Sequence, residues 1–220
     1  MTVMFLINAI YFKGSWTYEF DKNDTRTQPF YMSNSSETDC DMMKQENVFS
    51  RYFNQEFQAV DLPYGNAGFS MAIFLPRQDK SLDDLISQMN ENTWKNWLEN
   101  FSEDTTILYL PKFRMEYNRI LNDDLTALGM GIAFDKDGAD FSRINPFIQL
   151  FISRVIHKTF VQVDEKGTEA SAVTVVEVGF TSGGQDNYMT VNRPFIFVIH
   201  DNYTGSILFM GKITNPIWEE

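Results

Sequence analysis

The sequence predicts an α+β protein with more strand than helix, and three observations lead to that fold class. Most of the chain consists of short alternating or uniformly apolar runs separated by turn residues, a pattern typical of strands. Only residues 81–101 and 117–128 have the i, i+3, i+4, i+7 spacing of a helix face. The 220 residues are 43% hydrophobic and 15% aromatic, which is enough for a sizeable core and excludes a mainly disordered chain.

Residues 3–12 form the first predicted element, a strand. Val3, Phe5 and Ile7 alternate with residues that are also largely apolar, so we expect this strand to be fully buried. The segment has no basic n-region and no small-residue cleavage site, so it does not have the form of a signal peptide. A native chain that opens inside a core strand is unusual, so we interpret Met1 as either the start codon of a truncated gene or an internal methionine.

Two hairpins are predicted next. Residues 26–33 and 37–44 have the pattern of a polar hairpin pair, and residues 57–64 and 68–76 are two apolar runs joined by Tyr64-Gly65-Asn66. The second apolar run ends at Pro76, because proline has no N–H with which to continue a strand ladder.

The helical spacing begins after Ser81, which is a good N-cap residue, and acidic residues follow it in the first turn. Trp94 and Trp97 continue the segment as a second short helix. Residues 105–116 return to a strand pattern. Residues 117–128 are again predicted to be helical, with Gly129 ending the helix at its C′ position.

The last third of the chain returns to strands. Residues 150–163 alternate, and a loop of small and polar residues follows. Residues 195–200 and 207–213 then predict a strongly apolar hairpin across the turn at 202–205.

Charge and composition exclude several classes of partner. The net charge of −12 would repel nucleic acid phosphates, so we expect no nucleic acid partner. No run of about 18 apolar residues occurs, so we expect no membrane partner. Cys40 is the only cysteine, which rules out an internal disulfide and a thiolate metal cluster.

No catalytic or metal-binding pattern occurs. His157 and His200 both lie in apolar strand patterns, and no nucleophile elbow, phosphate loop or metalloprotease motif is found, so we expect no enzyme activity and no cofactor. The D-x-D-G-x-D run from Asp135 to Asp140 mimics the start of a calcium loop. Pro146 occupies the place of its bidentate glutamate, so we interpret the run as a solvated turn.

The most informative segment is 165–178, E-K-G-T-E-A-S-A-V-T-V-V-E-V. It alternates as a strand would, yet its first half has no bulky side chains, and a glycine pair follows at 183–184. An ordinary edge strand explains the alternation. A segment that is compatible with both loop and strand also explains the small residues.

E-K-G-T-E-A-S-A closely resembles the proximal hinge of the reactive-centre loop in inhibitory serpins. Other signatures of that family occur in order and at the family's spacing. They are N-A-I-Y-F-K-G-S-W (8–16), L-P-Y (62–64), F-L-P (74–76), L-P-K-F (110–113), L-x-x-L-G-M (125–130), A-D-F-S (139–142), V-I-H-K-T-F (155–160), N-R-P-F-I-F (192–197) and I-L-F-M-G-K-I-T-N-P (207–216).

The resemblance implies a serpin fold with mixed sheets A, B and C, of which residues 1–220 form one partial domain and residues 165–192 form the hinge and reactive-centre loop. It implies a suicide inhibitor of serine proteases that acts outside the cell or is exported. It also implies that the N-terminal half of the fold is a missing partner, without which this chain alone is not a competent inhibitor. The alternatives are a non-inhibitory carrier or chaperone of the same family and an inactive truncated fragment.

In this family the cleaved loop inserts into sheet A, so the hinge needs small inward-facing side chains. The resemblance assigns the hinge to Glu165, Gly167, Thr168, Glu169, Ala170, Ser171, Ala172, Val173 and Thr174. Thr168, Ala170, Ala172 and Thr174 would face inward, and Gly167 permits the change of direction.

If Glu165 matches the hinge glutamate of the family, the family's usual loop length implies a reactive bond between Thr181 and Ser182. Phe180 and Gly183 remain alternatives for the P1 residue. Residues 167–192 contain no lysine or arginine. The expected targets are therefore chymotrypsin-, elastase- or subtilisin-like proteases, because trypsin-like enzymes require a cationic P1 residue.

The resemblance also implies two interactions around sheet A. Asn8 and His157 would form the shutter hydrogen bond beneath the opening strands. Lys112 and Glu165 would pair across the breach beside Trp16, with a small contribution to stability if the pair is exposed.

Overall fold

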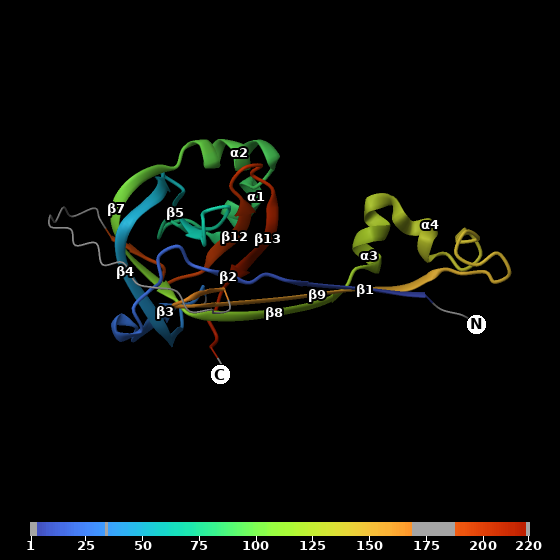
Figure 1. Cartoon of the computed structure of the whole chain (residues 1–220), viewed down its shortest axis with the longest axis horizontal. Helices are drawn as coiled ribbons and strands as arrows, with labels where there is room; N and C mark the ends of the chain where they lie inside the picture. Colours follow the sequence, from blue (N-terminus) through green and yellow to red (C-terminus); the bar gives the residue numbers. More distant parts are fainter. Residues whose placement is uncertain (1–3, 34, 169–187, 219–220) are drawn as a thin grey trace. The chain divides into compact units, whose positions relative to one another are not determined.

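The computed structural model of the chain describes residues 4–33, 35–168 and 188–218. It divides into two compact units, which we describe separately. Unit 1 contains residues 1–12 and 115–161, and unit 2 contains residues 13–114 and 162–220. Strands predominate in both, which confirms the predicted α+β class (Figure 1). None of the helices in the described ranges is long and apolar enough to cross a membrane.

Unit 1 is built on paired strands. Strand β1 (Met4–Tyr11) pairs in parallel with the first part of β9 (Ile152–Asp164), and Asn8 stands opposite His157. Strand β8 (Phe113–Ile120) also pairs with β9. Three short helical segments follow β8, namely α3 (Asn122–Leu125), η2 (Thr126–Met130) and α4 (Gly131–Phe134).

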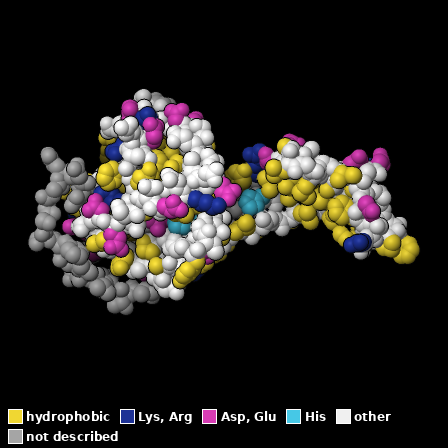
Figure 2. Space-filling view, turned by 90° about the horizontal axis from the view of Figure 1, so that it is seen from above, with side chains coloured by type: hydrophobic (Ala, Val, Ile, Leu, Met, Phe, Trp, Pro, Cys, Tyr) yellow, Lys and Arg dark blue, Asp and Glu magenta, His cyan; other side chains and the backbone are white. Residues whose placement is uncertain are grey.

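The prediction that the first strand is fully buried is wrong. Strand β1 is present, but Phe5 is 55% exposed and Ile7 is 69% exposed. A strand is buried on both faces only when a second layer covers each of them, and within unit 1 the described residues do not cover β1 in this way. Figure 2 shows further apolar side chains at the surface of this unit, and Leu128 and Phe147 are the most exposed.

The prediction of a helix over 117–128 is also wrong at its start. Residues 117–120 belong to β8, and helical structure begins only at Asn122. Asn122 ends the strand, because its side-chain oxygen accepts a hydrogen bond from the backbone N–H of Val155 and its amide donates to the Ser153 carbonyl. Gly129 takes a φ of +97°, as a C′ glycine would, but helical hydrogen bonding continues beyond it.

Unit 2 is dominated by an eight-stranded sheet. Its order is β11 (Tyr188–Thr190), β7 (Ser102–Pro111), β4 (Glu37–Phe53), β5 (Phe57–Tyr64), β6 (Phe69–Pro76), β12 (Phe195–Asp201) and β13 (Ile207–Ile213), with β3 (Arg26–Tyr31) paired to β4. The pairs β3–β4, β5–β6 and β12–β13 are antiparallel, which confirms the predicted hairpins.

Strand β4 is longer than the 37–44 segment that its sequence predicts. It continues to Phe53, because Met42–Arg51 pairs antiparallel with β7 and Ser50–Phe53 pairs with β5. The polar residues in the middle of β4 lack clear alternation, so only the pairing of distant strands reveals this extension.

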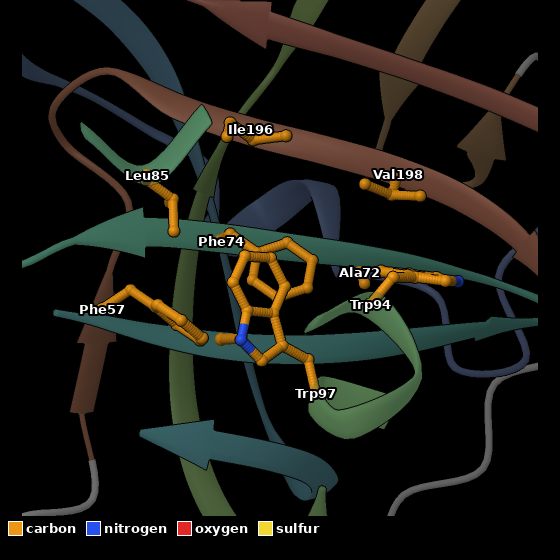
Figure 3. Close-up of a cluster of buried hydrophobic side chains, with 9 residues drawn as sticks. Phe57, Ala72, Phe74, Leu85, Trp94, Trp97, Ile196 and Val198 are labelled. Carbon is orange, nitrogen blue, oxygen red and sulfur yellow. The ribbon is translucent and has the colours of Figure 1, made fainter. Parts of the chain in front are cut away.

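Helices α1 (Leu82–Gln88) and α2 (Glu91–Glu99) pack on this sheet. The Ser81 hydroxyl accepts a hydrogen bond from the Asp84 N–H, which confirms the predicted N-cap. Asn90 and Thr93 form a capping box that separates the two helices. The enclosed core, drawn in Figure 3, contains Phe57, Ala59, Ala72, Phe74, Leu85, Trp94, Trp97, Ile196 and Val198.

Candidate functional site

The candidate site lies in unit 2, where the chain reverses direction after β9. Lys166 donates its backbone N–H to the Asp164 carboxylate at 2.8 Å, which forms the turn. Strand β10 (Gly167–Thr168) then runs antiparallel to the end of β9 and also antiparallel to β2 (Gly14–Ser15). Gly167 and Thr168 of the predicted hinge therefore form a short strand between β9 and β2.

Gly167 is required at this position by both conformation and space. Its φ is +143°, which residues with a side chain rarely adopt. A Cβ atom added to Gly167 would lie 2.2 Å from the carbonyl oxygen of Gly14 and 2.7 Å from the Ser15 Cα. Because both of those atoms belong to the backbone, no side-chain rotation could relieve the clash.

We therefore expect Gly167→Ala to lower the free energy of unfolding by about 2–4 kcal/mol, since it combines backbone strain with a steric clash. Gly65→Ala is the matched control. Gly65 also has a positive φ, +52°, but no atom lies within 4 Å of its added Cβ, so strain alone should cost about 1 kcal/mol. Urea denaturation of both variants measures the difference, and equal losses would contradict the proposed clash.

Thr168 is buried and takes part in a polar contact. Its hydroxyl lies 2.6 Å from the Tyr64 hydroxyl, and its side chain is almost fully enclosed. Burial raises the pKa of the Tyr64 phenol far above its ordinary value, so this group remains a neutral hydroxyl. Tyr64 belongs to the L-P-Y motif, and nothing in that motif predicts its contact with the hinge.

Trp16 lies at the centre of this arrangement. Its ring stacks on Tyr64 with centroids 4.5 Å apart, and its indole N–H donates to the Asp164 carbonyl at 2.9 Å. The backbone N–H of Trp16 donates to the Lys166 carbonyl. The tryptophan therefore contacts both the end of β9 and the turn that leads into the hinge.

The predicted ion pair is also present in unit 2. Lys112 Nζ lies 3.4 Å from Glu165 Oε2, and the two side chains are only 14% and 4% exposed. The prediction of a small contribution assumed an exposed pair, so it does not apply here. Thr25 donates its hydroxyl to Glu165 Oε1 at 2.9 Å, and Lys112 Nζ lies 4.2 Å from the ring centroid of Trp218. Neither Thr25 nor Trp218 lies in one of the motifs that carry the resemblance, so no local pattern identifies them.

Two opposing effects act on the Glu165 carboxyl. Burial alone would raise its pKa, but the backbone N–H of Glu165, the Thr25 hydroxyl and the Lys112 ammonium stabilise the charged form and lower its pKa below its ordinary value. A lowered pKa in the folded state stabilises the protein above the unfolded value, and this contribution disappears as the pH falls through the folded value.

At pH 7 we expect Glu165→Gln to be about 1–3 kcal/mol less stable than the wild type, because the charged hydrogen bond is lost. This difference should shrink as the pH falls from the ordinary glutamate pKa, where the unfolded chain takes up the proton, through the lowered pKa of the folded state. Urea denaturation at pH 7 and pH 3 measures it, with the exposed Glu99→Gln as the control. A difference that stays constant with pH would contradict the assignment.

In unit 1, Asn8 and His157 are brought together as register partners of β1 and β9. The Asn8 amide nitrogen lies 3.4 Å from His157 Nδ1, and the ring of Tyr117 meets the imidazole edge-on at 6.2 Å. This contact joins the two strands at mid-length, and its role as a shutter stays a prediction.

Several predicted site residues lie outside the described residues. They are the later hinge positions Glu169, Ala170, Ser171, Ala172, Val173 and Thr174, and the reactive-bond positions Phe180, Thr181, Ser182 and Gly183. The described chain resumes with β11, which pairs in parallel with Ile107–Tyr109 of β7.

The aspartate run that resembles a calcium loop and the second histidine form other contacts. The Asp135 carboxylate accepts a hydrogen bond from the Asp137 N–H within a turn. His200 is buried, with Nε2 3.0 Å from Asp61 Oδ1. Within the described ranges, no group of three or more acidic, histidine or cysteine side chains is arranged to hold a metal ion.

Comparison with known proteins gives a consistent result over most of the chain. The family model "Serpin (serine protease inhibitor)" matches residues 1–216. Human Serpin B11 is 36% identical in an alignment of 219 residues that covers 98% of this chain and 56% of that protein. Human leukocyte elastase inhibitor is 35% identical in an alignment of 224 residues that covers 98% of this chain and 59% of that protein.

A solved structure with the same fold is that of the thermophilic serpin tengpin in its native state. The TM-score is 0.84 at 31% sequence identity, and the match covers 96% of this chain and 55% of that structure. The chain therefore spans little more than half the length of the proteins that it matches.

Proposed function

This chain belongs to the serpin family, and from that membership we propose that it is the C-terminal part of a serine protease inhibitor that acts as a suicide substrate. Serpins are in general protease inhibitors rather than enzymes, and one relative is named for its inhibition of leukocyte elastase. Because the chain covers little more than half of its relatives, the activity of the whole protein is part of the proposal.

The observation that carries this proposal is the position of β10. Gly167–Thr168 already runs antiparallel to β9 on one side and to β2 on the other. If this register continued along β9 after cleavage, Ala170 would stand opposite Val161 and Ala172 opposite Thr159. Strand β10 would then be the start of the strand that a cleaved loop adds to the sheet.

In the proposed reaction, the serine hydroxyl of the protease attacks the carbonyl carbon of the P1 residue. The peptide bond to P1′ breaks, its nitrogen takes up the proton lost by the serine, and an ester joins P1 to the protease. Insertion of about fifteen loop residues, at about 3.3 Å each, would move the attached protease by about 50 Å. The new strand pairing makes this step favourable. The native state is metastable and persists before cleavage because its conversion is slow.

The proposed reactive bond is Thr181–Ser182, with Phe180 and Gly183 as the other candidates for P1. To test this proposal, the chain joined to the residues that precede it in its gene is incubated with chymotrypsin, elastase, subtilisin and trypsin. An adduct that survives denaturing electrophoresis supports the mechanism. The mass of the released peptide, starting at Ser182, Thr181 or Gly184, identifies P1. Cleavage without any adduct would overturn the inhibitor proposal.

Loop insertion also requires β1 and β9 to separate. His157→Ala removes the contact with Asn8, so we expect spontaneous insertion to become about fivefold faster, as the loss of about 1 kcal/mol from one hydrogen bond implies. Native electrophoresis over time would measure the appearance of the inserted form. Lys158→Ala, at the neighbouring exposed position on β9, is the control, and the same rate for both variants would contradict the proposed shutter.

A second candidate function, as a carrier of a small apolar molecule, is supported by a pocket between α2 and β13. The pocket has a volume of about 380 Å³ and is lined by apolar side chains that include Met89, Trp94, Ile207 and Met210. Volumes of this size suit small ligands. If the pocket binds apolar molecules, an apolar dye should quench the tryptophan fluorescence of the chain. Loss of this quenching in Met210→Asp, but not in the control Met130→Asp, would favour this function over inhibition alone.

A further inference from the structure

A polar cleft in unit 2 lies outside the site described above. Its volume is about 820 Å³, and its lining includes Asn54, Arg77, Lys80, Thr190 and Arg193. We call it the arginine cleft. Arg77 and Lys80 lie on the segment after β6, whereas Arg193 precedes β12, so residues from distant parts of the chain form its wall.

Backbone carbonyl groups hold both guanidinium groups in place. Arg193 donates from Nε and Nη2 to the Pro76 carbonyl, at 3.1 and 2.6 Å. Arg77 donates from Nε to the Asn54 carbonyl at 3.0 Å, and its backbone N–H donates to the Glu56 carbonyl. These bonds fix the orientation of the two side chains without neutralising their charge.

The charges around the cleft are unbalanced. Burial, and then repulsion by Arg77, lowers the pKa of Arg193. Lys80 is paired with Glu56 at 2.9 Å, and Asp79 is the acidic residue in the lining. Among the described residues, no carboxylate forms an ion pair with either arginine. The cleft is therefore locally cationic on a chain whose net charge is −12.

We propose that the arginine cleft binds a phosphate dianion between Arg77 and Arg193, either as free inorganic phosphate or as the end group of a small phosphate monoester. The two Nη atoms of a guanidinium group can donate parallel hydrogen bonds to phosphate oxygens while Nε is held by a carbonyl, and two such groups suit a doubly charged ligand. The volume exceeds that of a phosphate ion and leaves room for a small organic group beside the amide side chains of Asn54 and Asn192.

The test is a titration of the ¹⁵N-labelled full chain, followed by the Nε–Hε resonances of its arginines. The probes are inorganic phosphate, glucose 6-phosphate and glucose, all at one ionic strength maintained with potassium chloride. We expect saturable shifts for Arg77 and Arg193 with both phosphate compounds and none with glucose. Tighter binding of glucose 6-phosphate would identify a monoester site, and equal affinities would identify a site for the inorganic ion.

Substitutions separate a specific site from general charge effects. Arg77→Gln should weaken phosphate binding by about tenfold or more, since it removes one charged fork. At position 193 the variant is Arg193→Lys, because Arg193→Gln would remove a partly buried charge and risk unfolding. Arg193→Lys keeps the positive charge but loses the planar guanidinium group, so it should also weaken phosphate binding. Lys95→Gln, which changes an exposed side chain of α2, should leave the affinity unchanged. Shifts that never saturate, or that are equal in chloride and phosphate, would overturn the proposal.

Discussion

Replacing Thr168 with arginine is expected to abolish the formation of a covalent protease adduct while the loop is still cleaved. Thr168 is almost fully buried in β10 and hydrogen-bonded to Tyr64, so a long cationic side chain cannot enter this position without losing its hydration. Insertion of the loop would stop at position 168, the second residue of β10. The acyl-enzyme would then have time to hydrolyse. We expect the adduct yield to fall at least about tenfold, as the buried charge is not compensated.

The measurement compares adduct and cleaved product on denaturing gels for the wild type and two variants. Thr168→Ser keeps a small side chain and a hydroxyl group for Tyr64, so its adduct yield should stay near that of the wild type. Circular dichroism ensures that each variant is folded before it meets the protease. A normal adduct yield for Thr168→Arg would show that β10 does not begin the inserted strand.

Replacing Phe74 with alanine is expected to cause the largest loss of stability, about 3–5 kcal/mol. Phe74 is fully buried on β6, and its ring meets Phe57 at 5.4 Å and Trp97 at 5.2 Å between centroids. Figure 3 shows it at the centre of the cluster beneath α2.

Phe69→Ala is the control on the same strand. Phe69 is 40% exposed, so removal of its ring loses less buried area, and the expected loss of stability is about 1 kcal/mol. Urea denaturation followed by tryptophan fluorescence would measure both variants. Similar losses for the two would mean that the cluster does not determine the stability of unit 2.

The sequence by itself was sufficient to predict those turns and helix caps that neighbouring residues form among themselves. Gly65 permits the β5–β6 turn with its positive φ, and Ser81 caps α1 through its own side chain. The serpin resemblance paired Asn8 with His157 and Lys112 with Glu165, and the structure brings both pairs within 3.4 Å. The roles that the resemblance assigns to them remain predictions.

Only the tertiary structure decided the rest. Residues 117–120 have a helical pattern but form a strand, because β9 offers them a hydrogen-bonding partner. Thr168 contacts Tyr64, 104 positions away in sequence, and Trp218 reaches Lys112 from 106 positions further along the chain. Local patterns report which side chains could be buried or paired. Which partners they meet depends on strand pairing between distant segments, and that pairing overrides weak local preferences.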